Sequence, residues 1–125
     1  MADEASRRIA LCASTDLADG GLAVAFDVCW RGEVLRAFAV RHQGQVHAYL
    51  NRCTHVQMEM DYREGHFFDD SGCWLVCATH GAVFAPDTGA CVGGPGRGPL
   101  TKIDITEEAG QVYWHTAPTL QPVEF

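Results

Sequence analysis

Two short motifs restrict what this chain can fold into. Cys53-Thr54-His55 and Cys77-Ala78-Thr79-His80 each follow a segment with the pattern of a β-strand, and each opens a loop. Two such loops held side by side would bring two thiols and two imidazoles to one point. This donor set suits one tetrahedral zinc ion or a [2Fe-2S] cluster whose irons have different ligands. With one residue between Cys53 and His55 on an extended chain, both side chains lie on the same side, and this spacing leaves both alternatives open.

The remaining sequence predicts short β-strands separated by turns. The 125 residues include 13 Gly and 5 Pro, and 47% of them are hydrophobic, which is typical of a single globular domain over residues 1–125. Helix patterns are weak. Gln43-Gly44 predicts a hairpin turn, and residues 108–110 predict a second one between the last two strands. We expect strands at 8–12, 22–30, 34–41, 45–50, 74–76, 83–85, 90–92, 100–105 and 111–115.

Charge and apolar content exclude several classes of partner. Acidic residues outnumber basic ones 16 to 9, giving a formal charge of −7, which argues against nucleic acid and against anionic membrane surfaces. No apolar run approaches the roughly 18 residues of a membrane-spanning helix. The polar start lacks a signal-peptide pattern, so we expect a cytoplasmic protein. Thiols stay reduced in the cytosol, so the six Cys favour metal binding over disulfides.

The two motifs and their surroundings resemble the Rieske family of [2Fe-2S] proteins. The family pattern is C-x-H, a spacer, C-x-x-H-G with an aromatic residue soon after, a D-x-x-x-G-type turn and a Gly-Pro loop. The matching residues in this chain are Cys53-Thr54-His55, Cys77-Ala78-Thr79-His80-Gly81-Ala82-Val83-Phe84, Asp87-Thr88-Gly89-Ala90-Cys91 and Gly94-Pro95. The resemblance covers about residues 34–115.

This resemblance implies the fold and the cofactor. The expected fold is all-β: a Rieske-like antiparallel β-sandwich with a small cluster-binding subdomain of loops and short strands, at about residues 51–96. The expected cofactor is one [2Fe-2S] cluster. By the resemblance, Cys53 and Cys77 bind one iron, and His55 and His80 bind the other.

Departures from the family pattern indicate the low-potential, ferredoxin-like branch. The spacer between His55 and Cys77 holds 21 residues, which predicts an extra hairpin or another excursion of the chain. Met58 and Thr79 stand where high-potential members carry a disulfide. Ala82 and Phe84 stand where those members place Ser and Tyr hydroxyls near the cluster. Without these hydrogen bonds the reduced state is less stabilised, so the resemblance implies a potential of roughly −150 mV.

The function that follows from the resemblance is one-electron transfer. We expect a carrier that takes electrons from a reductase and passes them to an oxygenase, with no catalytic residues and no enzymatic activity of its own. One alternative is a small Rieske subunit fixed in a larger redox enzyme, similar to that of nitrite reductases. Another is a zinc-stabilised interaction module.

Several other residues have structural interpretations. Cys29 is expected in the core, packing is the expected role of Cys91, and Trp74 is expected in the core or at its rim. The histidines outside the motifs are expected at strand or surface positions; they are His42, His47, His66 and His115.

Overall fold

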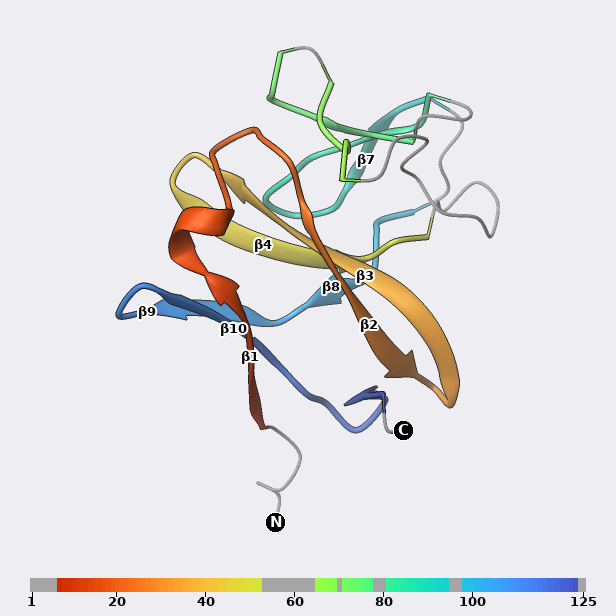
Figure 1. Ribbon diagram of the computed structural model, residues 1–125. Coiled ribbons are helices and arrows are strands. Elements are labelled where there is room, and N and C mark those ends of the chain that lie inside the picture. The colour runs from red at the N-terminus through yellow and green to blue at the C-terminus, as the bar shows by residue number, and fades with distance from the viewer. Residues whose placement is uncertain (1–6, 53–64, 70, 78–80, 95–97, 124–125) are drawn as a thin grey trace.

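The described part of the protein is built almost entirely from antiparallel β-sheets. The computed structural model describes residues 7–52, 65–69, 71–77, 81–94 and 98–123 (Figure 1). The central sheet has the strand order β11-β2-β3-β4-β8. Its strands are β2 (Val24–Trp30), β3 (Glu33–His42), β4 (Gln45–Leu50), β8 (Lys102–Ile103) and β11 (Leu120–Pro122). This all-β architecture confirms the predicted fold class.

Two smaller sheets pack on opposite faces of the central sheet. The lower sheet in Figure 1 has the order β1-β10-β9, with β1 at Arg8–Ala13, β9 at Ile105–Glu108 and β10 at Gln111–His115. The upper sheet has the order β5-β6-β7, with β5 at Leu75–Val76, β6 at Val83–Phe84 and β7 at Cys91–Gly93. A single turn of 3-10 helix, η2, spans Ser14–Asp16. The described residues contain no helix with the length and apolar composition needed to cross a membrane.

Two tight hairpins build the centre of the sheet. Arg31 and Gly32 join β2 to β3, and Gln43 and Gly44 join β3 to β4, with φ angles of 51° and 81° in the first turn and 52° and 81° in the second. Positive φ at both central residues matches the right-handed twist of the flanking strands, which is why such two-residue turns suit hairpins. The predicted hairpin at Gln43-Gly44 is therefore confirmed.

Both faces of β3 and β4 are buried, and each face belongs to a different core. Phe38 and Val40 point to one face, whereas Ala37 and Ala39 point to the other, as the alternation of a strand requires. The upper core contains Phe38, Val40, Tyr49, Phe67, Leu75, Cys77, Ala82, Phe84 and Leu100. The lower core contains Leu17, Val28, Ala37, Ala39, Ala48, Leu50, Ile103, Val112, Trp114 and Leu120.

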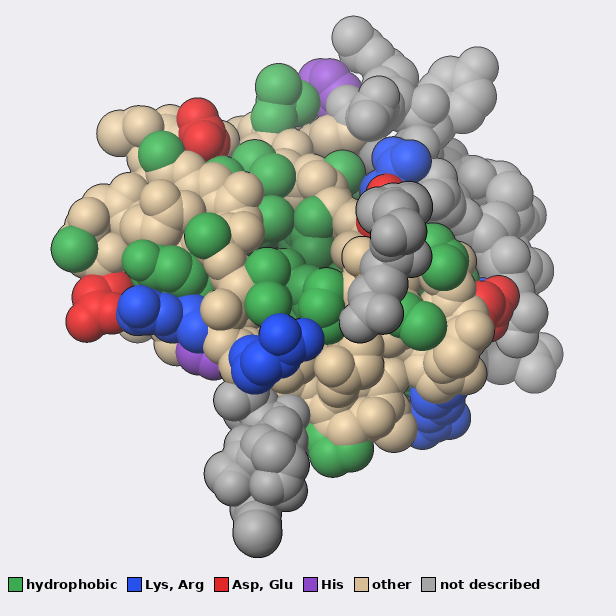
Figure 2. All heavy atoms as spheres, turned by 60° about the horizontal axis from the view of Figure 1, so that its bottom comes forward, with side chains coloured by type: hydrophobic (Ala, Val, Ile, Leu, Met, Phe, Trp, Pro, Cys, Tyr) green, Lys and Arg blue, Asp and Glu red, His purple; other side chains and the backbone are tan. Residues whose placement is uncertain are grey.

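The lower side of the molecule carries partly exposed apolar groups. In the view of Figure 2, hydrophobic side chains form a band across the middle of this face, with Lys and Arg beside it. Several half-buried hydrophobic residues pack against the lower core, among them Ile9, Phe26 and Trp30. The rings of Phe26 and Trp114 lie 5.5 Å apart between centroids. The lower core therefore reaches the surface through these half-buried residues.

Two strand predictions differ from the structure. The single strand expected at 100–105 is wrong: the chain changes sheets at Asp104, so that β8 pairs with β4 and β9 pairs with β10. The predicted last hairpin is therefore formed by β9, through a turn at Ala109 and Gly110. The strand β11 was not predicted, because Pro122 argues against a strand. The structure accommodates this proline because β11 is an edge strand, where proline is tolerated.

The described part of the long spacer forms the predicted extra hairpin. Phe68 pairs with Leu75 in an antiparallel bridge. The Val76 amide donates to the Phe67 carbonyl at 2.8 Å, and the Asp69 amide donates to the Trp74 carbonyl at 2.9 Å. This hairpin leads into β5 and delivers the chain to Cys77.

Candidate metal centre

One of the four predicted ligands, Cys77, lies within the described residues. It follows β5 directly, and its side chain is fully buried, with 0% exposure. Cys53, His55 and His80 lie outside the described residues, as do Met58 and Thr79. The described residues hold no group of three or more His, Cys, Asp or Glu side chains placed to bind one ion. The predicted set of four ligands therefore stays a prediction.

The loop that begins at Cys77 is closed by its own backbone. The Cys77 amide donates to the Ala82 carbonyl at 2.8 Å, and the Gly81 amide donates to the Cys77 carbonyl at 2.8 Å. On either side, Leu75 pairs with Phe84 and Val76 with Val83. These bonds fix the two ends of a short loop that carries both predicted ligands of the second motif.

The end of β7 lies against this loop with no room for a side chain. Gly94 has a φ of +73°, and a Cβ built on it would lie 2.4 Å from the Gly81 carbonyl oxygen and 2.7 Å from Ala82 Cα. Such distances are far below any normal carbon contact, so the position requires glycine. The predicted Gly94-Pro95 loop therefore begins in direct contact with the ligand loop. A buried thiol at the start of a loop that a second loop closely approaches fits an iron–sulfur group bound between loops.

The surroundings of Cys77 are apolar. Ala82 and Phe84 are fully buried in the upper core together with Cys77. Phe38 and Phe67 stack beneath them, with ring centroids 3.8 Å apart and an interplanar angle of 11°. Neither Ala82 nor Phe84 carries a hydroxyl, so neither side chain donates a hydrogen bond toward the thiol.

The other cysteines lie outside this arrangement. Cys91 is half-buried and packs against the upper core, which confirms its packing role. The prediction that Cys29 is a core residue is wrong: Cys29 alternates with Val28 on β2 and shares a face with the exposed Asp27, so it remains partly exposed. Cys73 is an exposed free thiol at the spacer hairpin.

The remaining aromatic and histidine residues follow the expectations in part. The prediction that Trp74 lies in the core or at its rim is wrong: Trp74 is 41% exposed and is not among the residues that pack against the upper core. His42, His47 and His115 lie on strands, and His66 is exposed, as predicted. The His42 ring stacks on Phe68, with centroids 6.3 Å apart.

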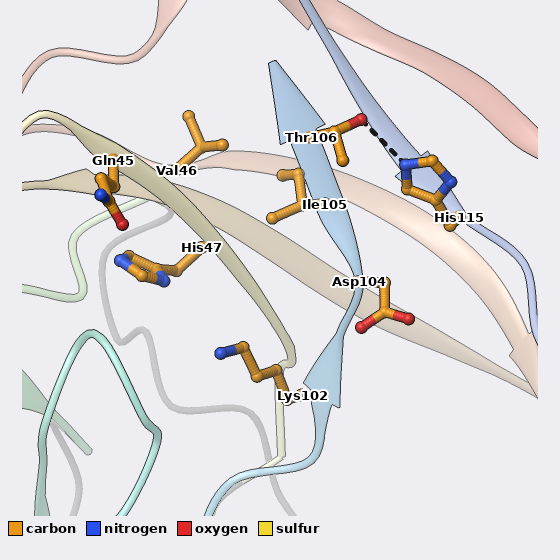
Figure 3. A pocket seen from close by; sticks show the side chains of 8 residues that line it. All are labelled: Gln45, Val46, His47, Lys102, Asp104, Ile105, Thr106 and His115. Atoms are coloured by element: carbon orange, nitrogen blue, oxygen red, sulfur yellow. Dashed lines mark hydrogen bonds between the residues drawn. The ribbon is translucent and has the colours of Figure 1, made fainter.

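A polar groove of about 500 Å³ lies apart from Cys77, where β4, β8 and β9 meet (Figure 3). Thr106 and His115 form a hydrogen bond of 2.8 Å across one side of it. On the other side, burial lowers the pKa of His47, and the Lys102 charge lowers it further. Lys102 and Asp104 bring opposite charges to the same groove, and the described residues that line it do not include Cys77.

Sequence reasoning missed Tyr49, which lies in the upper core with Cys77. Its side chain is fully buried, and its hydroxyl donates to the Pro86 carbonyl at 2.7 Å. Burial raises the pKa of this phenol above its ordinary value, so the group stays protonated and acts as a donor. The available signal was a tyrosine between Ala48 and Leu50 in a predicted strand, since a buried phenol usually finds a partner.

Comparisons with known proteins agree with this geometry. The profile of the Rieske [2Fe-2S] domain matches residues 7–104. The ferredoxin of carbazole 1,9a-dioxygenase from Nocardioides aromaticivorans IC177 is 23% identical, with a TM-score of 0.68 over 86% of this chain and 95% of that one. A ferredoxin from Sphingomonas yanoikuyae B1 is 25% identical, with a TM-score of 0.68 over 90% of this chain and 100% of that one.

The same fold also occurs within a larger protein. The terminal oxygenase of carbazole 1,9a-dioxygenase from Novosphingobium sp. KA1 is 22% identical, with a TM-score of 0.70 over 94% of this chain but 31% of the oxygenase. No curated protein sequence matches the chain. The structural likenesses establish the fold, and the domain profile covers most of the chain, including all four predicted ligands. This chain belongs to the Rieske [2Fe-2S] domain family, and one [2Fe-2S] cluster is its cofactor.

Proposed function

We propose that the protein is a one-electron carrier that receives electrons from a reductase and delivers them to an oxygenase. One observation carries this proposal: the chain matches two ferredoxins over 95% and 100% of their lengths, but matches 31% of a terminal oxygenase. The fold therefore corresponds to a whole carrier and to one part of an oxygenase. A carrier of this kind transfers electrons without being an enzyme itself.

We assign the ligands by the two motifs. Cys53 and Cys77 would hold one iron, and His55 and His80 would hold the other, within a cluster-binding part at about residues 51–96 of a single domain. The burial of Cys77 and the closed loop from Cys77 to Ala82 support this assignment. Gly94 supports it as well, because it packs directly on the backbone of Gly81 and Ala82 in the same loop. When bound, the cluster supplies a centre that accepts and releases one electron.

The side chains around Cys77 favour a low potential. Hydrogen bonds to cluster sulfurs stabilise the more negative, reduced state. Ala82 and Phe84 are buried in the same core as Cys77 and offer no hydroxyl for such bonds. The predicted potential is therefore near the lower end of the Rieske range, roughly −150 mV. A low-potential carrier suits delivery of electrons to an oxygenase.

The test begins with the composition of the purified chain. The proposal predicts a coloured protein with two iron atoms and two acid-labile sulfides per chain, reducible by one electron. A colourless protein with one zinc per chain would instead support the interaction module. Cys73→Ser is the matched control for Cys77→Ser, because Cys73 is an exposed thiol outside the predicted ligand set.

Electron delivery is then measured directly. Reduced protein is mixed with an oxidised Rieske oxygenase in a stopped-flow instrument, and reoxidation is followed by visible absorption. We expect multiple turnovers when a flavin reductase and its nicotinamide donor are added. A protein that holds the cluster but co-purifies in a fixed large complex, and is not reoxidised when free, would favour the subunit alternative.

A further inference from the structure

The hydrogen bond from Tyr49 holds the turn of the hairpin that β6 and β7 form. The phenol donates to the Pro86 carbonyl at 2.7 Å, and both residues are buried. The same ring lies against Gly89: a Cβ built there would be 2.8 Å from Tyr49 Cε1. The turn of this hairpin is therefore in direct contact with β4 through one side chain.

Two contacts from the segment around β8 hold the same turn. Lys102 Nζ donates to the Asp87 carbonyl at 3.4 Å, and the Leu100 amide donates to the Gly89 carbonyl at 2.8 Å. Figure 3 shows the Lys102 side chain extending from β8 beside His47, with its amine directed toward the neighbouring loop. The turn is thus anchored to the central sheet by one phenol, one ammonium group and one backbone amide.

The opposite end of the hairpin reaches the candidate metal centre. Ala82, directly before β6, accepts the hydrogen bond of the Cys77 amide. Gly94, directly after β7, rests on the backbone of Gly81 and Ala82. The hairpin therefore connects the anchored turn to the loop that carries Cys77.

The pairing within this hairpin is too short to position it alone. β6 has two residues and β7 has three, and the register shifts between Val83 and Phe84. An isolated short two-stranded hairpin has little stability in water, so its place is set by contacts with the rest of the fold. The hydrogen bond of the buried Tyr49 phenol is directional, unlike apolar packing. It therefore fixes the position of the turn as well as burying it.

We propose that Tyr49 is a positioning residue for the cluster: by holding Pro86, it fixes the hairpin whose other end carries the Cys77 loop and seats Gly94. This inference rests on the proposed ligand role of Cys77. Loss of the hydroxyl leaves the buried Pro86 carbonyl without its donor. A buried acceptor left unsatisfied shifts a local opening equilibrium by roughly ten- to a hundred-fold.

The test uses Tyr49→Phe in the protein with its cluster. This variant keeps the ring beside Gly89 and removes only the donor. The matched control is Tyr113→Phe, since Tyr113 is a half-buried tyrosine of β10 in the lower sheet, where its ring contacts Arg8 at 4.0 Å. Hydrogen exchange is measured by mass spectrometry on peptides that cover residues 75–84, 85–94 and 98–103.

We expect Tyr49→Phe to accelerate exchange at least about tenfold in all three peptides, including the Cys77 and Gly81 amides. The electron paramagnetic resonance spectrum of the reduced protein should broaden, and its midpoint potential should shift. Tyr113→Phe should leave these peptides, the spectrum and the potential as in the wild type. Lys102→Met, which removes a weaker anchor of the same turn, should produce a smaller change in the same peptides.

A local effect would overturn the inference. If Tyr49→Phe accelerates exchange only around Gly89 and Leu100, and the spectrum and potential remain unchanged, then Tyr49 stabilises the turn without positioning the cluster. Gly94→Ala serves as the reference for a direct disturbance, because the added methyl group meets the Gly81 carbonyl. A wild-type protein without iron and sulfide would instead contradict the proposed function, so the two failures are distinguishable.

Discussion

The two sides of the central sheet are built by different means. Below it, β10 shares five residue pairs with β1, with a register shift between Ala10 and Cys12, and four residue pairs with β9. Above it, β5 and β6 share two residue pairs, and β6 and β7 share two with a register shift. Long strand pairings stabilise the lower sheet. The upper sheet depends instead on core packing and on the contacts that hold the β6–β7 turn. The longer strand pairing therefore lies on the side of the central sheet away from Cys77.

The side chains on the two faces differ in the same way. Ala37, Ala39 and Ala48 face the lower core, whereas Phe38 and Tyr49 face the upper core. Buried aromatic rings supply more apolar contact area than alanine does. The upper core therefore compensates with large rings for the pairing that its short strands lack.

The largest expected effect is loss of the cluster on substitution of Cys77 by serine. Serine keeps the size but is a poor ligand for iron, so iron and sulfide content should fall to background, and the visible colour should disappear. The lower sheet should persist, because it packs on a different core from the one that contains Cys77. Circular dichroism would follow the β-structure, and a variant that keeps its sulfide would contradict the assignment.

Removing an aromatic ring from the upper core should be the next largest effect. Phe38→Ala removes one partner of the stack with Phe67 and should lower the free energy of unfolding by about 3–5 kcal/mol. Cluster loss in a chelator should accelerate in parallel. Val112→Ala in the lower core should cost about 2 kcal/mol and leave the resonance spectrum of the reduced protein unchanged. Urea titrations of both variants measure the free energies, and equal spectral changes in both would break the distinction between the two cores.

The ion pair between Arg41 and Glu107 ties β3 to β9 on the lower side, with side chains 15% and 27% exposed. The Arg41 guanidinium lowers the pKa of Glu107 from 4.5 to about 2. A carboxyl group whose pKa falls on folding stabilises the protein above its unfolded pKa, and this contribution is lost as the pH falls toward the folded pKa.

Glu107→Gln should therefore lower the free energy of unfolding by about 1–2 kcal/mol at pH 7, an amount reduced by solvent exposure of the pair. The difference from the wild type should shrink as the pH falls from about 4.5 toward about 2. Denaturant titrations across this range measure it. Glu108→Gln is the control, because Arg8 and Glu108 form a pair that is 51% and 70% exposed. A pH-independent difference would show that the pair acts by another mechanism.

The smallest expected effect is on the potential. Phe84→Tyr adds a hydroxyl in the upper core and should raise the midpoint potential by about 40 mV, equivalent to about 1 kcal/mol for one electron. Protein-film voltammetry measures the shift. A potential that stays unchanged or falls would mean that the added hydroxyl does not donate to the cluster.

The sequence predicts the hairpin of β3 and β4 because strand alternation and the Gln43-Gly44 turn are local signals. It does not predict the hairpin of β2 and β3 at Arg31-Gly32. It does not predict the change of sheet at Asp104, since periodicity cannot tell which neighbour a strand pairs with. The contact of Tyr49 with Pro86 joins residues 37 positions apart, so no local pattern contains it. The ligand set is predicted from the two motifs and the family they belong to, and Cys77 is the one predicted ligand among the described residues.

The central claim is that two thiolates and two imidazoles hold the cluster from two loops. Electron–nuclear double resonance of the reduced protein, grown with ¹⁵N-labelled histidine, tests it most directly. The account predicts hyperfine couplings from two histidine nitrogens in the wild type and from one in His80→Cys, provided that the variant retains its sulfide. Absence of histidine coupling in a wild-type protein that contains iron and sulfide would contradict it.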